Sequence, residues 1–149
     1  MSRLLVDANI FLELELSQSK ARDCKAMLSQ IASGKLKAMT TDFILDSIAV
    51  VMEDKGSPPA DIRRFFASLL LYKGLAVHNL DLKGRVTATG EMERYGLGFD
   101  DSTSVAVMKL LKLKEIASFD HHFDRVEGIK RVEPKTVTQV GRGKREGSA

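Results

Sequence analysis

The stretch that decides the fold is Leu4-Leu5-Val6-Asp7, close to the start of a chain of 149 residues. Three apolar residues followed at once by an acid predict a short buried strand that ends at a polar site. From Ile10 onward apolar residues recur at helical spacing, so a helix should follow the strand directly. A carboxylate at the end of a buried strand is costly without a partner, and Asp7 is therefore a candidate functional residue.

The alternation of strand and helix continues along the chain. Further strands are predicted at residues 37–39, 75–78, 115–118 and 130–132, with amphipathic helices between them. Strands joined by helices form a parallel sheet that is covered on both faces. The expected fold class is therefore α/β, a three-layer α/β/α sandwich with a central, mainly parallel sheet of four to five strands.

Two of the predicted helices carry specific expectations. Ser17 or Ser19 should cap the second helix, because serine side chains accept hydrogen bonds from the free backbone N–H groups there. Residues 81–94 show a weaker helical pattern, interrupted by two glycines. In that helix the residues expected to face inward are Leu82, Val86 and Met92.

Length and composition favour one globular domain. The chain is 44% hydrophobic and long enough to bury a core without disulfides, and its single cysteine, Cys24, cannot form a disulfide framework. We expect one domain at residues 1–136 and a disordered tail at residues 137–149, whose end is basic and lacks large apolar residues. No signal segment is visible and no apolar run approaches the roughly 20 residues of a membrane span, so a cytoplasmic location is expected.

Acidic residues recur where predicted strands end or where the next helices begin. They are Asp7, Asp42, Asp46, Asp100, Asp101 and Asp120. Asp100 is most simply the cap of a helix, and Asn9 could either orient a carboxylate or cap the first helix. The functional crevice of a parallel sheet lies beyond the carboxyl ends of its strands, so several of these acids should meet there. Clustered carboxylates repel one another, and a hard divalent cation such as Mg²⁺ or Mn²⁺ would remove the repulsion.

Other kinds of site are disfavoured. His121 and His122 are adjacent and should point in different directions, with no further ligand at the spacing of a zinc site. The chain lacks the glycine-rich loops that bind nucleotide phosphates and lacks a Gly-x-Ser-x-Gly nucleophile motif. The net charge of +3 is weak support for binding to nucleic acid.

The segments around these acids resemble the PIN domain, the nuclease fold of VapC-type toxins and related bacterial and archaeal proteins. Residues 4–12 are similar to its first motif. Residues 99–108 resemble its central acidic motif, and residues 116–124 resemble its final motif. The resemblance spans about residues 3–134, and the three motifs in this order are more specific than any one alone.

The resemblance implies metal-dependent hydrolysis of phosphodiester bonds in single-stranded RNA. Asp7, Asp101 and Asp120 would hold one or two Mg²⁺ or Mn²⁺ ions, and Asp46 would bind metal or position water. The resemblance also implies a homodimer and, for a toxin, an antitoxin protein as partner. Basic side chains should frame the RNA groove, with Lys20, Arg22, Arg63, Arg64 and Lys73 as candidates.

One position departs from the family pattern. PIN domains usually carry a glutamate in the helix after the second strand, and that position falls on Ser47 here. Asp46 is the expected substitute, although a shift of one residue turns a side chain by about 100° around a helix. Asp42, one turn earlier on the same face, is the reserve candidate.

Two alternatives to a nuclease stay open. The change at Ser47 is compatible with a catalytically weak or inactive PIN-like module that binds RNA or a protein complex. A phosphoacceptor domain of the receiver type also gathers acids at strand ends. It needs an acceptor aspartate after the third strand, where this chain has His78-Asn79-Leu80, so it is the weaker alternative.

Overall fold

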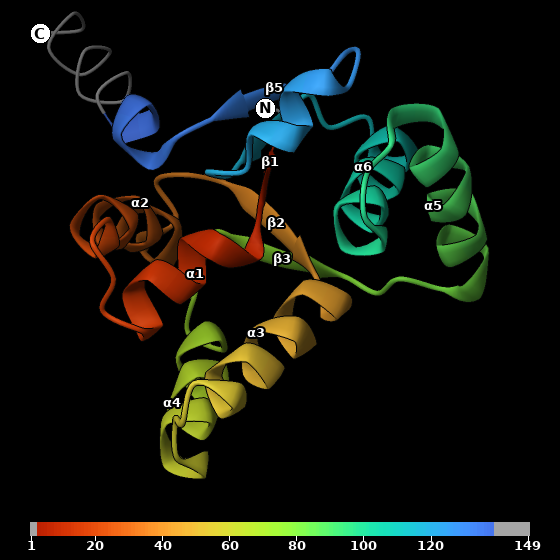
Figure 1. The fold of residues 1–149 in the computed structure, drawn as a ribbon. Helices are drawn as coiled ribbons and strands as arrows, with labels where there is room; N and C mark the ends of the chain where they lie inside the picture. The colour runs from red at the N-terminus through yellow and green to blue at the C-terminus, as the bar shows by residue number, and fades with distance from the viewer. Residues whose placement is uncertain (1–2, 139–149) are drawn as a thin grey trace, which may run out of the picture.

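The computed structural model describes residues 3–138 and contains a five-stranded sheet (Figure 1). Its strands are β1 (Leu4–Val6), β2 (Ala38–Thr41), β3 (Leu75–His78), β4 (Glu115–Ala117) and β5 (Lys130–Val132). The order across the sheet is β3-β2-β1-β4-β5, and all four pairings are parallel. The structure confirms the predicted α/β fold class, a three-layer α/β/α sandwich.

The helices form two groups around the sheet. They are α1 (Ala8–Glu15), α2 (Ala21–Ser33), α3 (Asp42–Asp54), α4 (Pro59–Leu69), α5 (Leu82–Tyr95) and α6 (Phe99–Leu111), with a short 3₁₀ helix η1 (His121–Arg125). In Figure 1, α5 and α6 lie side by side at the right, and α1, α2, α3 and α4 form the other group at the left and below. None of the helices at residues 3–138 has the length and apolar character that crossing a bilayer requires.

The central strand β1 marks the point where the chain changes direction across the sheet. The chain runs from β1 outward to β2 and β3, and then returns to place β4 on the other side of β1. Leu5 and Val6 of β1 are completely buried. In parallel α/β sheets the functional crevice lies beyond the carboxyl ends of the two strands at such a switch point, which are β1 and β4 here.

The predicted cap of the second helix was wrong. Lys20 is the residue that precedes α2, and no side chain caps this end. Ser17 has a left-handed backbone (φ 51°), and its N–H donates to the carbonyl of Leu14, so it belongs to the turn that ends α1. The N–H of Lys20 donates instead to the Glu13 carboxylate at 3.0 Å, and Glu13 lies seven residues earlier in the chain.

The inward face predicted for α5 was wrong at Leu82 and Val86, whereas Met92 is half-buried. Leu82 and Val86 are 80% and 70% exposed, whereas Ala88 and Glu91 are buried. The small side chain of Ala88 lies on the buried face of α5, and Lys109 of α6 pairs with Glu91 across the interface of the two helices. The buried face was therefore selected by the neighbouring helix and not by hydrophobic periodicity.

The described chain ends in a helical segment at residues 134–138. Val137 packs against the core, and the Thr138 hydroxyl donates to the carbonyl of Pro134. The contact with the core therefore reaches Val137, one position beyond the domain boundary expected at residue 136, and the helical segment continues to Thr138. Residues 139–149, which make up most of the predicted tail, lie outside the described part, and that boundary stays a prediction.

Candidate metal centre at the carboxyl end of the sheet

Asp7 lies directly beyond β1 and is only 9% exposed. Its Oδ1 accepts a hydrogen bond from the N–H of Ala8 at 2.9 Å, so the carboxylate caps α1. Its Oδ2 accepts from the hydroxyl of Ser118 at 2.6 Å and from the amide of Asn9 at 3.3 Å. The sequence left two roles open for Asn9, and the contact with the Asp7 carboxylate supports the orienting one.

Ser118 joins the ends of the two strands at the switch point. Its Oγ donates to Asp7 and accepts from the N–H of Asp120 at 3.0 Å and from the amide of Asn9 at 3.2 Å. Ser118 is completely buried. No sequence motif pointed to a function for Ser118, although a small polar residue at the buried end of a strand, two positions before an acid, was the available signal.

Asp101, Asp120 and His122 form a compact group of possible ligands. One donor atom from each lies within 4.8 Å of the others. Nδ1 of His122 is 3.1 Å from Oδ1 of Asp120 and 3.7 Å from Oδ2 of Asp101. The side chain of Asp101 is 12% exposed and that of Asp120 30%, so the group opens to solvent on the Asp120 side.

The electrostatics of the site link four acids. Burial first, and then the nearby charges of Asp100, Asp120 and Asp7, together raise the pKa of Asp101 to about 8. Burial also raises the pKa of Asp7, against the opposing effect of its hydrogen bonds, and Asp120 and Asp100 add to the rise. The repulsion that the sequence predicted among these acids is therefore present in the folded chain.

Asp100 is not the helix cap that was predicted. Gly98 precedes α6, and Asp100 and Asp101 both lie in the first turn of the helix. The Asp100 carboxylate accepts from the N–H of Asp101 at 2.8 Å and is exposed. Both acids lie where the helix dipole favours negative charge, which offsets part of the cost of placing them together.

The acids of α3 have different surroundings. Asp42 accepts from the N–H groups of Phe43 and Leu80, both at 2.8 Å, and so ties α3 to the loop after β3. The Ser47 hydroxyl donates to the carbonyl of Phe43. Asp46 is exposed, and within residues 3–138 no hydrogen bond or ion pair joins it to the cluster. Its catalytic role stays a prediction.

Arg131 holds the turn that carries Asp120 and His122. Its guanidinium donates to the carbonyl of Ser118 at 3.1 Å and to the Asp124 carboxylate at 3.1 Å, and it also contacts Glu133 and His121. These contacts join β5 to the end of β4 and to η1. Hydrogen bonds from Arg131 and His121 lower the pKa of Asp124.

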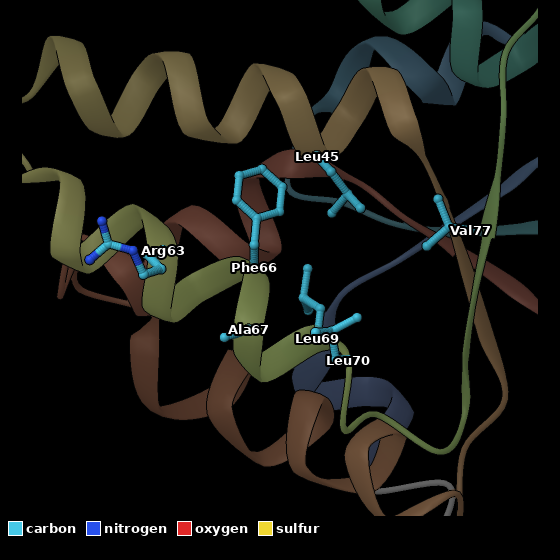
Figure 2. Close-up of a pocket in the computed structure, with 7 residues that line it drawn as sticks. All are labelled: Leu45, Arg63, Phe66, Ala67, Leu69, Leu70 and Val77. Atoms are coloured by element: carbon cyan, nitrogen blue, oxygen red, sulfur yellow. The ribbon is translucent and has the colours of Figure 1, made fainter.

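Of the basic residues expected to frame the RNA groove, only some lie near the acidic cluster. Nζ of Lys20 lies 4.2 Å from the ring centre of Phe119, the neighbour of Asp120. Arg64 pairs with Asp61 on the exposed side of α4. Arg63 lies beside an apolar pocket of about 530 Å³ between α3, α4 and β3 (Figure 2). The other residues of the pocket are Leu45, Phe66, Ala67, Leu69, Leu70 and Val77, none of them acidic.

Fold and site together define a class of protein: a three-layer α/β/α domain with carboxylates from β1, α6 and the β4 loop converging beyond the carboxyl end of a parallel sheet. The chain belongs to the PIN-domain family, whose sequence profile matches residues 4–129. Members of this family are nucleases, and an acidic cluster fits that chemistry. A comparison with curated protein sequences gave no significant match.

Several solved structures share the fold. A VapC20 toxin of Mycobacterium tuberculosis, described as cleaving the sarcin-ricin loop, has a TM-score of 0.70 and 21% identity, covering 88% of this chain and 99% of that one. DNA-bound VapBC from Salmonella typhimurium has a TM-score of 0.64 and 16% identity, covering 90% and 99%. FitAcB from Neisseria gonorrhoeae has a TM-score of 0.61 and 14% identity, covering 88% and 97%. At these identities the likeness establishes the fold alone.

Proposed function

We propose that the chain is a metal-dependent endoribonuclease that hydrolyses phosphodiester bonds of single-stranded RNA. The observation that carries the proposal is the convergence of Asp7, Asp101 and Asp120 from three separate segments on one site. Burial and mutual repulsion make it unfavourable to hold these carboxylates together, and a bound cation would offset both effects.

The donor set of the site fits Mg²⁺ or Mn²⁺. Asp7, Asp101 and Asp120 offer carboxylate oxygens, the ligands that hard divalent cations prefer, and these three residues would hold the ion. When bound, such an ion acidifies water and stabilises negative charge on a phosphoryl group. Ser118 and Asn9 fix the Asp7 carboxylate in one orientation, and Arg131 fixes the turn that presents Asp120.

RNA must reach an acidic site against its own negative charge. Lys20 is a basic candidate with a contact beside the cluster, because its ammonium group lies over the ring of Phe119, the neighbour of Asp120. We propose that its ammonium group binds a phosphate of the RNA beside the scissile bond. Asp120 is the most exposed of the three candidate ligands, so the substrate would approach from its side.

The decisive experiment is cleavage of a fluorescent single-stranded RNA by the full chain with Mn²⁺ or Mg²⁺. The variant Asp7→Asn plus Asp101→Asn should lose activity, by at least about a hundredfold for the loss of two ligands. Asp61→Asn removes an exposed carboxylate on α4 and should leave the rate unchanged. Equal cleavage by all three proteins would assign the activity to a contaminant and contradict the proposal.

The similar solved structures motivate a finer proposal. Several are complexes of a toxin with an antitoxin. We propose that this chain is a toxin, that a small antitoxin protein is its partner, and that it forms a homodimer. The apolar pocket of Figure 2, with Leu70 87% exposed at its edge, suits a protein partner better than RNA. A neighbouring gene for a small DNA-binding protein that binds this chain would support the proposal.

A second candidate function rests on Ser47 and on the exposed position of Asp46. If no side chain of α3 serves the site, the protein would be a weak or inactive module that binds RNA or a protein complex. RNA binding with no metal-dependent cleavage in the assay above would favour that module over the nuclease.

A further inference from the structure

The two histidines of η1 point to different groups. The ring of His121 contacts Asp124 at 3.2 Å and Arg131 at 3.1 Å, on the outer side of the turn. The ring of His122 turns toward the cluster, where its Nδ1 approaches Asp120 and Asp101. His122 therefore adds a nitrogen donor to a site otherwise made of carboxylate oxygens.

The spacing of these donors is that of neighbouring ligands on one ion. Two ligands at right angles, each about 2.1 Å from an octahedral ion, lie about 3 Å apart. Nδ1 of His122 is 3.1 Å from the Asp120 oxygen, which matches this value, and 3.7 Å from the Asp101 oxygen, which is close to it. The backbone N–H of His122 also donates to the same Asp120 oxygen at 2.9 Å, which holds the main chain of His122 beside that carboxylate.

We propose that the imidazole of His122 is a direct ligand of the cation held by Asp101 and Asp120. The inference rests on the proposed metal-dependent function and specifies the ligand set of its site. His122 would add a ligand to the expected carboxylates, in a chain that has Ser47 at the position where PIN domains usually carry a glutamate. The site becomes a mixed nitrogen and oxygen site, open to substrate because the side chain of His122 is 56% exposed.

A nitrogen ligand changes which ions the site prefers. Carboxylate oxygens suit Mg²⁺ and Mn²⁺ alike, whereas imidazole favours transition-metal ions over Mg²⁺. We therefore expect the protein to bind Mn²⁺ more tightly than Mg²⁺, and this preference should depend on His122. If the ring served only as a cation that balances the acids, its removal would leave metal binding unchanged or strengthen it, which is the opposite result.

The test uses the full chain loaded with Mn²⁺. Electron spin echo envelope modulation detects nitrogen nuclei bonded directly to Mn²⁺, and calorimetry gives the Kd for Mn²⁺ and for Mg²⁺. Wild type and His121→Asn should show the nitrogen signal, and His122→Asn should not. The Kd for Mn²⁺ should rise about tenfold in His122→Asn and less for Mg²⁺. His121→Asn is the matched control, because it changes the same residue type in the same turn.

Each other outcome overturns the inference in a recognisable way. Bound Mn²⁺ without a nitrogen signal in wild type excludes His122 as a ligand and leaves the nuclease proposal intact. A nitrogen signal that persists in His122→Asn assigns the nitrogen to another residue. Failure of wild type to bind Mn²⁺ or Mg²⁺ at all would overturn the proposed function together with this inference.

Discussion

At the scale of single residues, the chemistry of the site depends on how each carboxylate is held. Asp7 is buried, but three hydrogen bonds from Ala8, Ser118 and Asn9 satisfy its oxygens. Asp101 is more open to solvent but lies among three other acids, and its pKa is raised to about 8 by burial and by their charges. Hydrogen bonds thus stabilise the Asp7 carboxylate, whereas Asp101 lies among unbalanced charges that the proposed cation would offset.

The raised pKa of Asp101 predicts how metal-free stability depends on pH. In the unfolded chain this group titrates near pH 4, so between about pH 4 and about pH 8 the folded state binds the extra proton. The free energy of unfolding contributed by Asp101 is therefore present at low pH and is lost as the pH rises toward 8. Thermal melts in a chelator should show a fall in Tm from about pH 6 to about pH 8 that is smaller in Asp101→Asn. Equal pH dependence in both proteins would contradict the assignment.

Lys20 predicts a specific effect on RNA binding. Lys20→Ala should weaken binding to single-stranded RNA and reduce the slope of log affinity against log salt concentration by about 0.7, the value for one phosphate contact. KM should rise while kcat changes little, because Lys20 is proposed to bind a phosphate and to take no part in the bond cleavage. Lys35→Ala, on an exposed residue beyond α2, is the control. Unchanged salt dependence in Lys20→Ala would remove this residue from the RNA site.

At the scale of elements, one ion pair anchors the helix pair that carries Asp101. Nζ of Lys109 on α6 lies 2.9 Å from both carboxylate oxygens of Glu91 on α5, and the Glu91 side chain is 11% exposed. Lys109 also lies 5.0 Å from the ring centre of Tyr95. The pair joins α5, which buries little apolar surface, to α6, which begins with the acidic motif, and so it stabilises the helix that carries Asp101.

Removal of Lys109 should destabilise the domain measurably. Lys109→Ala leaves the Glu91 carboxylate buried without a partner, and because Lys109 is itself 35% exposed we expect a loss of about 1–2 kcal/mol rather than the larger cost of a fully buried pair. Urea unfolding monitored by circular dichroism would measure it. Arg64→Ala breaks an exposed pair on α4 and should change the free energy of unfolding by less than about 0.5 kcal/mol. Similar effects of the two variants would mean that the Glu91–Lys109 pair is effectively solvated.

At the scale of the whole molecule, the acidic site joins segments that are far apart in the chain. β1, α6 and the β4 loop meet only in the folded state, so a cation that binds their carboxylates together stabilises the fold. The apolar pocket between α3 and α4 is lined by other residues, so the two sites can be altered separately by mutation.

Divalent metal should therefore raise the melting temperature. At a Mn²⁺ concentration about 100 times the Kd, the stabilisation is about 2.7 kcal/mol, or about 5–10 °C for a domain of this size. Asp7→Asn plus Asp101→Asn should abolish the shift and melt at a higher temperature than wild type without metal, because it removes the repulsion. A melting temperature that ignores millimolar Mn²⁺ would count strongly against a metal site.

The sequence by itself determined the α/β class, all five strands within one or two residues, and the acids that follow β1 and β4. These features depend on local periodicity and on the position of a charge after an apolar run, which a chain carries without its fold. The predicted caps of α2 and α6 were wrong: the N–H of Lys20 pairs with the Glu13 carboxylate seven residues earlier, and α6 begins after Gly98, which has no side chain to cap it.

Only the tertiary structure decided which side chains meet. Ser118 became the junction of the site because β4 lies beside β1, and His122 turned toward Asp101 because η1 folds back toward α6. The buried face of α5 was likewise selected by Lys109 of α6, at a position where periodicity predicted other residues. Such contacts depend on distances between segments remote in sequence, and no local pattern encodes those distances.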